Sequence, residues 1–145
     1  MTPIQENRII LLVEDDDNDV FFFRRALEKA GLDLPWRMVS DGEQALQYLT
    51  GQGIFAERTS HPLPDIIFLD LKLPYVNGLE VLEFIQKDTF LSSIDVIVLT
   101  SSPEERDRKR AYELGAKEYL VKPATPKTLL ELLETRSGPR VEAKL

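Results

Sequence analysis

The sequence contains no cysteine and only one histidine, His61. Without cysteine the chain has no disulfide, no thiolate metal site and no cysteine nucleophile, and this lack fits a reducing cytosol. With one histidine it has no metal cluster or catalytic triad built on imidazole. We assign His61 a surface role in a loop.

Long apolar runs and an excess of positive charge are also missing. No apolar stretch approaches the roughly 20 residues that a membrane-spanning helix needs, and the first six residues lack the pattern of a signal peptide. The 18 basic residues are outnumbered by 25 acidic ones, giving a net charge of -7. A nucleic-acid binder normally carries a basic face, and glycine-rich phosphate loops are absent as well. We therefore predict a cytoplasmic protein that binds neither membranes nor nucleic acid.

The 145 residues suit one domain with a single core. Residues 51–64 contain several glycines and prolines and predict an unusually long loop. Ser137-Gly138-Pro139 is expected to break the last helix. The predicted domain therefore has a core over about 8–136 and a mobile tail over 137–145.

Five short apolar runs predict strands that are buried on both faces, because their apolar residues are continuous rather than alternating. These runs are Ile9–Val13, Trp36–Val39, Ile66–Leu69, Ile94–Leu99 and Glu118–Val121. Helical spacing lies between them. Alternation of this kind predicts an α/β fold, with a parallel sheet, right-handed crossovers and helices on both faces.

The ends of the predicted helices carry recognisable signals. Gly31 is expected to end the first helix in a left-handed conformation, and Ser40 with Glu43 predicts a capping box at the second. The remaining helices are expected after Asn77-Gly78, at Ser102-Pro103 with Ser102 as a cap, and at Thr125-Pro126.

Acidic residues follow two of the predicted strands. Residues 14–17 read Glu-Asp-Asp-Asp, and Asp70 ends the third apolar run. In doubly wound sheets the ligand binds beyond the carboxyl ends of the strands, so these acids should converge there and bind Mg²⁺. The alternatives for residues 14–17 are a solvated charge run and acids at a helix N-terminus, a role we assign to Asp16 and Asp17.

Two further strand ends add chemistry to this edge. Lys122 follows the fifth run and precedes Pro123, in a peptide bond that can be cis, and a buried lysine should reach an anion. Thr100 ends the fourth run and is placed to bond a phosphoryl oxygen. Asp70 is either a plain strand-end residue or a nucleophile toward phosphorus.

Four ordered motifs lie within about residues 8–136: Leu-Val-Glu-Asp-Asp, Phe-Leu-Asp-Leu-Lys-Leu-Pro, Val-Leu-Thr-Ser-Ser and Tyr-Leu-Val-Lys-Pro. With these motifs the chain resembles the receiver domain of bacterial two-component response regulators, the CheY-like family. The resemblance implies a flavodoxin-like (βα)5 fold with strand order 2-1-3-4-5.

The resemblance also implies a role for each matching residue. Asp70 would accept phosphate from a phosphohistidine on a sensor histidine kinase, and Lys122 would pair with that phosphate. Thr100 would bond a phosphoryl oxygen, while Tyr119 would turn inward as Thr100 moves. The Mg²⁺ ligands would be Asp15, Asp70, the backbone carbonyl of Lys72 and, mostly through water, Glu14. Glu14 stands where the family usually has aspartate, and Lys72 and Ser102 flank the site where the family tunes the lifetime of the acyl phosphate.

A narrower resemblance is to stand-alone regulators paired with phytochrome kinases. Phe21, Phe22 and Phe23 span about 200° of a helix, so at least one should be exposed. We predict that Asn18, Asp19 and Phe22 contact the kinase. The alternative is that the extra phenylalanine packs under the last helix or the tail, and the resemblance leaves monomer and homodimer both open.

The predicted function is a single-domain phosphorelay receiver that signals through protein contacts. It would assist its own phosphorylation and dephosphorylation without being an enzyme on a free metabolite. The alternatives are a pseudo-receiver that only binds, and an aspartyl-nucleophile phosphatase of the haloacid dehalogenase class. In that class the nucleophile lies in an Asp-x-Asp motif at the first strand, whereas Asp70 follows the third.

Overall fold

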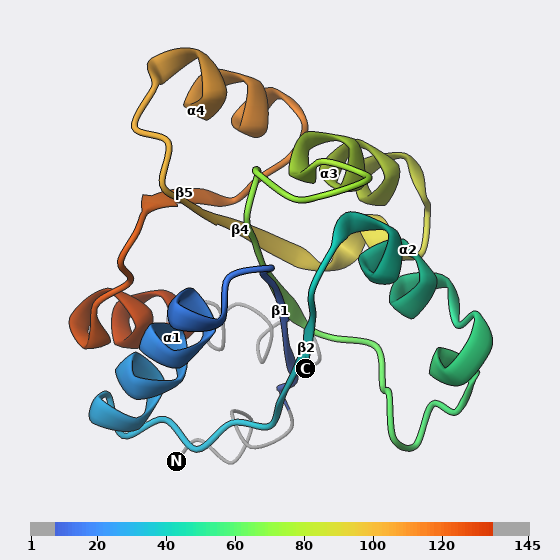
Figure 1. The fold of residues 1–145 in the computed structure, drawn as a ribbon, viewed down its shortest axis with the longest axis horizontal. Coiled ribbons are helices and arrows are strands. Elements are labelled where there is room, and N and C mark those ends of the chain that lie inside the picture. The colour runs from blue at the N-terminus through green and yellow to red at the C-terminus, as the bar shows by residue number, and fades with distance from the viewer. Residues whose placement is uncertain (1–7, 135–145) are drawn as a thin grey trace, which may run out of the picture.

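The computed structural model describes residues 8–134, which form a five-stranded parallel sheet flanked by helices (Figure 1). The strand order β2-β1-β3-β4-β5 confirms the predicted flavodoxin-like arrangement. The strands are β1 Ile10–Val13, β2 Trp36–Val39, β3 Ile66–Leu69, β4 Asp95–Thr100 and β5 Glu118–Val121. Each strand lies within one residue of its predicted bounds.

Helices connect successive strands. They are α1 Asp17–Lys29, α2 Gly42–Thr50, α3 Gly78–Lys87 and α4 Glu105–Glu113, with short 3-10 helices η2 Gly53–Ala56 and η3 Leu91–Ser93. A C-terminal helix begins at residue 126 and occupies the described residues to 134. The predicted helix break at Ser137 and the predicted mobile tail over 137–145 lie outside the described residues. Within residues 8–134, no helix has the length and apolar character needed to cross a membrane.

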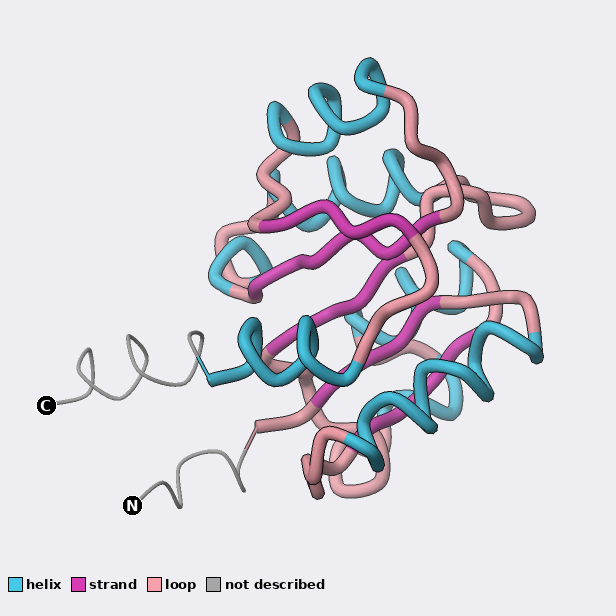
Figure 2. The backbone as a smooth tube through the Cα atoms, turned by 90° about the vertical axis from the view of Figure 1, so that its left-hand side faces the viewer, coloured by secondary structure: helices cyan, strands magenta, loops and turns pink. Residues whose placement is uncertain are grey.

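The sheet separates two hydrophobic cores, because alternate side chains of a strand point to opposite faces. On one face Leu11, Ile67 and Val98 pack with residues of α2, α3 and α4. On the other face the strands pack against α1 and the C-terminal helix, and the tilted rings of Phe23 and Phe68 are in contact with centroids 5.0 Å apart. Figure 2 shows the strands in magenta between these layers. Burying one such large apolar side chain stabilises the fold by about 1.5–3 kcal/mol, so both helical layers are held firmly to the sheet.

Both ends of α1 match their predictions. Asp16 caps α1, as predicted, by accepting hydrogen bonds from the backbone N–H groups of Asn18 and Asp19. Gly31 follows α1 with φ +75°, which glycine adopts without steric cost.

Two predicted caps were placed one or two residues off. The capping box of Ser40 and Glu43 is wrong, because α2 is capped by Asp41, whose carboxylate accepts from the N–H of Gln44. Helix α4 begins at Glu105 with Glu104 in the cap position, while the Ser102 hydroxyl accepts from the N–H of Glu104 at 3.3 Å. Ser102 therefore satisfies an N–H ahead of the helix rather than capping it.

Residues 51–64 form the long connection that the sequence predicts, and this connection has its own structure. Arg58 donates to the backbone carbonyls of Tyr48, Leu49 and His61. His61 is half-buried, with its ring edge-on to the rings of Tyr48 and Phe55. The predicted surface role of His61 is therefore corrected to a packing role, in which its ring helps to close the loop over the end of α2.

Candidate functional site

The acids of two neighbouring strands meet at the carboxyl edge of the sheet. Strands β1 and β3 pair in parallel with Val13 opposite Leu69, so the next residues, Glu14 and Asp70, lie side by side. The N–H of Asp70 donates to the carbonyl of Val13 at 3.1 Å, which extends the sheet to this position. The predicted convergence of the two strand ends is confirmed.

Three carboxylates at this edge are close enough to share one cation. Glu14, Asp15 and Asp70 each offer an oxygen, and these oxygens lie within 4.8 Å of one another. Glu14 and Asp70 are buried, whereas Asp15 is exposed. Carboxylate oxygens with one side open to water form a donor set of the kind that Mg²⁺ and Mn²⁺ use. The residues present therefore fit a hard divalent cation.

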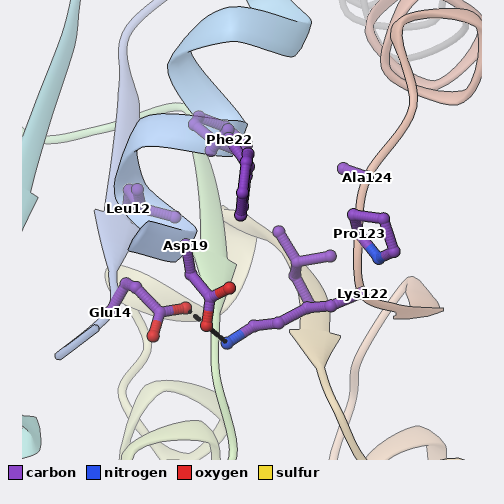
Figure 3. Close-up of a pocket in the computed structure, with 9 residues that line it drawn as sticks. Leu12, Glu14, Asp19, Phe22, Lys122, Pro123 and Ala124 are labelled. Atoms are coloured by element: carbon purple, nitrogen blue, oxygen red, sulfur yellow. Dashed lines mark hydrogen bonds and ion pairs between the residues drawn. The ribbon is translucent and has the colours of Figure 1, made fainter. Parts of the chain in front are cut away.

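Lys122 provides the positive charge of the site. It follows β5, and its peptide bond to Pro123 is cis. Its Nζ lies 2.7 Å from Glu14 Oε1, 2.7 Å from Asp19 Oδ2 and 2.9 Å from Asp70 Oδ2. Figure 3 shows the ammonium directed at the carboxylates of Glu14 and Asp19. The expectation that Lys122 reaches an anion is confirmed.

Burial and charge shift the pKa values of this cluster. Burial raises the pKa of Glu14 from 4.5 to about 7, against the lowering effect of its hydrogen bond to Lys122, and the nearby charge of Asp70 adds to the increase. Burial lowers the pKa of Lys122, but its hydrogen bonds to Asp19, Glu14 and Asp70 outweigh burial and leave it above its ordinary value. Lys122 therefore keeps its charge in the folded chain, while Glu14 holds its proton to a higher pH than an exposed glutamate does.

The loop from β3 to α3 is held close to Asp70. The backbone N–H of Lys72 donates to Asp70 Oδ1 at 3.2 Å, while Lys72 itself is exposed. A Cβ at Gly78 would clash with the backbone of Asp70, and one at Gly42 would clash with the carbonyl of Val76. These two close approaches need glycine, and they pack the loop against the starts of α2 and α3.

Thr100 and Tyr119 lie on the neighbouring strands β4 and β5. Thr100 is fully buried, and Tyr119 is 4% exposed, so its ring already points inward. The Tyr119 hydroxyl donates to the backbone carbonyl of Ser102 at 2.8 Å. Arg108 of α4 lies over the Tyr119 ring, 4.9 Å from its centroid. Strand β5 is thereby connected to α4 and to the segment that follows Thr100.

The start of α1 lies beside Lys122. Asn18 is exposed, and of the three phenylalanines Phe21 and Phe22 are 43% and 53% exposed, which confirms that they cannot all be buried. Phe22 lines a small pocket with Pro123, Ala124 and the stem of Lys122 (Figure 3).

The structure adds Asp19 to the site as a partner of Lys122, which the sequence analysis did not predict. A signal for it exists in the sequence. Asp19 precedes the buried residues Phe23, Ala26 and Leu27 by four, seven and eight positions, which is the spacing of one helix face. The carboxylate therefore lies at the edge of the inward face of α1, where it reaches Lys122 while its side chain stays 33% exposed.

Comparison with known proteins agrees with this geometry. Rcp1, a response regulator of Synechocystis sp., is 36% identical over 127 residues, which cover 88% of this chain and 84% of Rcp1. Its crystal structure in a Mn²⁺-bound form has a TM-score of 0.73 at 35% identity and covers 88% of this chain and 90% of that one.

Two phytochrome-related structures are also similar. The bacteriophytochrome response regulator RtBRR has a TM-score of 0.78 at 46% identity, covering 90% of this chain and 78% of its own. The phosphorylated cyanobacterial phytochrome response regulator RcpA has a TM-score of 0.75 at 34% identity, covering 88% and 89%. The family model for the response regulator receiver domain matches residues 10–134. Since that match spans nearly all of the described residues, the chain belongs to the response regulator receiver domain family.

Proposed function

We propose that Asp70 accepts a phosphoryl group from a phosphohistidine on a sensor histidine kinase, the general partner of receiver domains. The observation that supports this role most directly is the position of Asp70, a buried carboxylate with two acids and the Lys122 ammonium around it. An oxygen of Asp70 forms a bond to phosphorus while the phosphorus–nitrogen bond breaks, and the electron pair leaves with the imidazole. The product is an acyl phosphate.

Glu14, Asp15, Asp70 and the backbone carbonyl of Lys72 are the proposed holders of Mg²⁺, with Glu14 acting mostly through water. When bound, the ion neutralises charge on the phosphoryl oxygens, which is the main requirement of phosphoryl transfer. Lys122 supplies a second positive charge, 2.9 Å from the acceptor carboxylate. With these groups the chain assists its own phosphorylation, and attack of water on the acyl phosphate returns free Asp70 and phosphate.

Thr100 and Tyr119 are the proposed switch residues. The Thr100 hydroxyl would bond a phosphoryl oxygen. Its movement would shift the segment after Thr100 and so alter the contact of Tyr119, whose hydroxyl donates to the carbonyl of Ser102 at 2.8 Å. Because Tyr119 also contacts Arg108 of α4, the surface of α4 and β5 would respond. Phosphorylation then shifts the population between two arrangements of this surface. Lys72 and Ser102, next to Asp70 and Thr100, would adjust the lifetime of the phosphorylated form.

The proposed partners are proteins. Asn18, Asp19 and Phe22 would contact the kinase, and the similarity to RtBRR and RcpA favours a kinase of the phytochrome type. We propose no nucleic-acid contact, because Arg106, Arg108 and Arg110 of α4 each form an ion pair with a neighbouring glutamate. Phosphorylation could also lead two copies of the chain to form a homodimer, and the oligomeric state measured in the labelling experiment tests this.

The test is phosphoryl labelling with acetyl phosphate and Mg²⁺, read by intact mass and by oligomeric state. The unchanged protein is expected to gain one phosphoryl group, and Asp70→Asn to gain none. Asp17→Asn, which removes an exposed acid from the start of α1, is the matched control and should label normally. An unlabelled wild-type protein would indicate a pseudo-receiver, and catalytic turnover of a generic phosphate ester would indicate a phosphatase.

A further inference from the structure

Lys122 has one carboxylate partner that lies outside the group able to share a cation. Among the described residues, that group consists of Glu14, Asp15 and Asp70. Asp19 approaches from α1, and its Oδ2 is as close to the ammonium as Glu14 Oε1, both at 2.7 Å. The Asp19 side chain is 33% exposed, against 2% for Glu14. Lys122 is therefore shared between two buried acids that a metal would use and one acid that it would not.

We infer that Asp19 is a positioning residue, which holds Lys122 when Glu14 and Asp70 turn to a divalent cation. This inference rests on the proposed function, because it concerns the same metal site. Lys122 and the cation would draw on the same two carboxylates, Glu14 and Asp70. Two positive charges that share these carboxylates repel strongly in a site with little water. Without Asp19, Lys122 would have to give up its partners while remaining 12% exposed and close to a second cation. With Asp19, the ammonium keeps a hydrogen-bonded carboxylate in both states.

The fold keeps Asp19 in place for this task. Its backbone N–H donates to the Asp16 carboxylate at 3.1 Å, which fixes the first turn of α1. One turn later Phe23 is buried between Phe68 and Trp36. Asp19 therefore lies on a helix that is capped at its start and packed on the sheet. Its carboxylate loses little further conformational entropy when it binds the Lys122 ammonium.

Asp17 offers a matched comparison. It lies in the same first turn of α1 and has the same side chain, but it is exposed, and the Lys122 ammonium is contacted by Glu14, Asp19 and Asp70 instead. Changing Asp17 or Asp19 to asparagine removes the same charge from the same turn. A difference between the two variants therefore measures the contact with Lys122 rather than the net charge.

The experiment is a titration of the full chain with Mg²⁺ by calorimetry, with folding checked by circular dichroism. Asp19→Asn is expected to weaken Mg²⁺ binding by about tenfold, the lower range for losing a group that supports a metal site indirectly. Asp17→Asn should weaken it much less, and Asp19→Glu should recover most of the loss. In a Lys122→Met background the effect of Asp19→Asn should shrink to that of Asp17→Asn.

Equal effects of Asp17→Asn and Asp19→Asn, or an Asp19→Asn effect that persists undiminished without Lys122, would overturn the inference. A crystal structure of the unchanged protein with Mg²⁺ tests it without any variant, since Lys122 Nζ should then contact Asp19 and no longer Glu14. An ammonium that turns to solvent there contradicts the positioning role. Wild-type protein that binds no Mg²⁺ overturns the proposed function and this inference together, whereas normal wild-type binding with an unaffected Asp19→Asn overturns the inference alone.

Discussion

Two positively charged side chains, Arg58 and Lys122, each contact three oxygen acceptors, but the two clusters differ in what they can do. Arg58 donates to the neutral backbone carbonyls of Tyr48, Leu49 and His61. Lys122 contacts the charged carboxylates of Glu14, Asp19 and Asp70. A planar guanidinium suits fixed carbonyls near the end of α2, where the helix dipole favours positive charge. A compact ammonium among carboxylates can be displaced by another cation, so the Lys122 cluster can change state while the Arg58 cluster only holds a loop.

The largest expected effect is that of removing Lys122. In Lys122→Met the buried acids lose their cation, and breaking a buried pair of this kind costs about 3–5 kcal/mol. We expect that loss in the free energy of unfolding by urea, measured near pH 8 with a chelator, and we expect Mg²⁺ to restore much of it. Lys117→Met, at an exposed lysine ahead of β5, is the control. A Lys122→Met protein as stable as the wild type in chelator would show that the three contacts contribute nothing to stability.

Removing Arg58 is expected to have the next largest effect. Arg58→Ala leaves three carbonyls without their charged donor, at a cost of about 2 kcal/mol in the free energy of unfolding. The Mg²⁺ affinity should stay unchanged, because the carbonyls that Arg58 contacts lie near the end of α2 and in the connection from α2 to β3. Arg58→Lys should not rescue stability, since an ammonium lacks the fork that reaches several carbonyls. Loss of Mg²⁺ affinity in Arg58→Ala would mean that the two clusters are coupled.

The pH dependence of stability tests the Lys122 cluster in another way. Burial raises the pKa of Glu14 from 4.5 to about 7, so between these values the folded chain binds a proton that the unfolded chain has released. The stabilisation that comes from this proton is complete below the pKa of Glu14 in the unfolded chain. It is lost as the pH rises through the pKa of Glu14 in the folded chain. The free energy of unfolding of the metal-free protein should therefore fall by at most about 1.4 kcal/mol per pH unit in this window.

Glu14→Gln should remove this slope, and urea denaturation at several pH values with a chelator would measure it. Mg²⁺ affinity should rise over the same window, because the ligand must lose its proton. An equal slope in Glu14→Gln would assign the pH dependence to another group.

The smallest effect concerns the surface beside Lys122. Phe22→Ala removes an exposed ring next to Pro123 and Ala124 and should leave stability and acetyl phosphate labelling unchanged. If the kinase docks there, transfer from the kinase should slow by roughly fivefold, about 1 kcal/mol. Phe21→Ala, at the neighbouring exposed ring, is the matched control. An unchanged transfer rate in Phe22→Ala would move the docking surface elsewhere.

Much of the site could be predicted from local patterns. Continuous apolar runs identified the strands, and parallel strands bring their carboxyl ends to one edge. The sequence therefore predicts five residues at that edge, and the structure has them there: Glu14, Asp15, Asp70, Thr100 and Lys122. The helix caps were predicted wrongly where neighbouring polar residues could each serve as the cap, as with Ser40 and Asp41. Either residue can cap α2, and the backbone conformation selects Asp41.

Sequence alone determined the order of the elements, the buried strands and the set of charged groups at their ends, because these follow from periodicity and from the directions of parallel strands. The tertiary structure decided which charges touch. Asp19 was predicted only as a kinase contact, and the packing of Phe23 against the sheet also brings its carboxylate to Lys122. Arg58 and His61 were unremarkable loop residues until the chain folded back over the end of α2. Such contacts depend on distances between segments far apart in the chain, which local patterns do not encode.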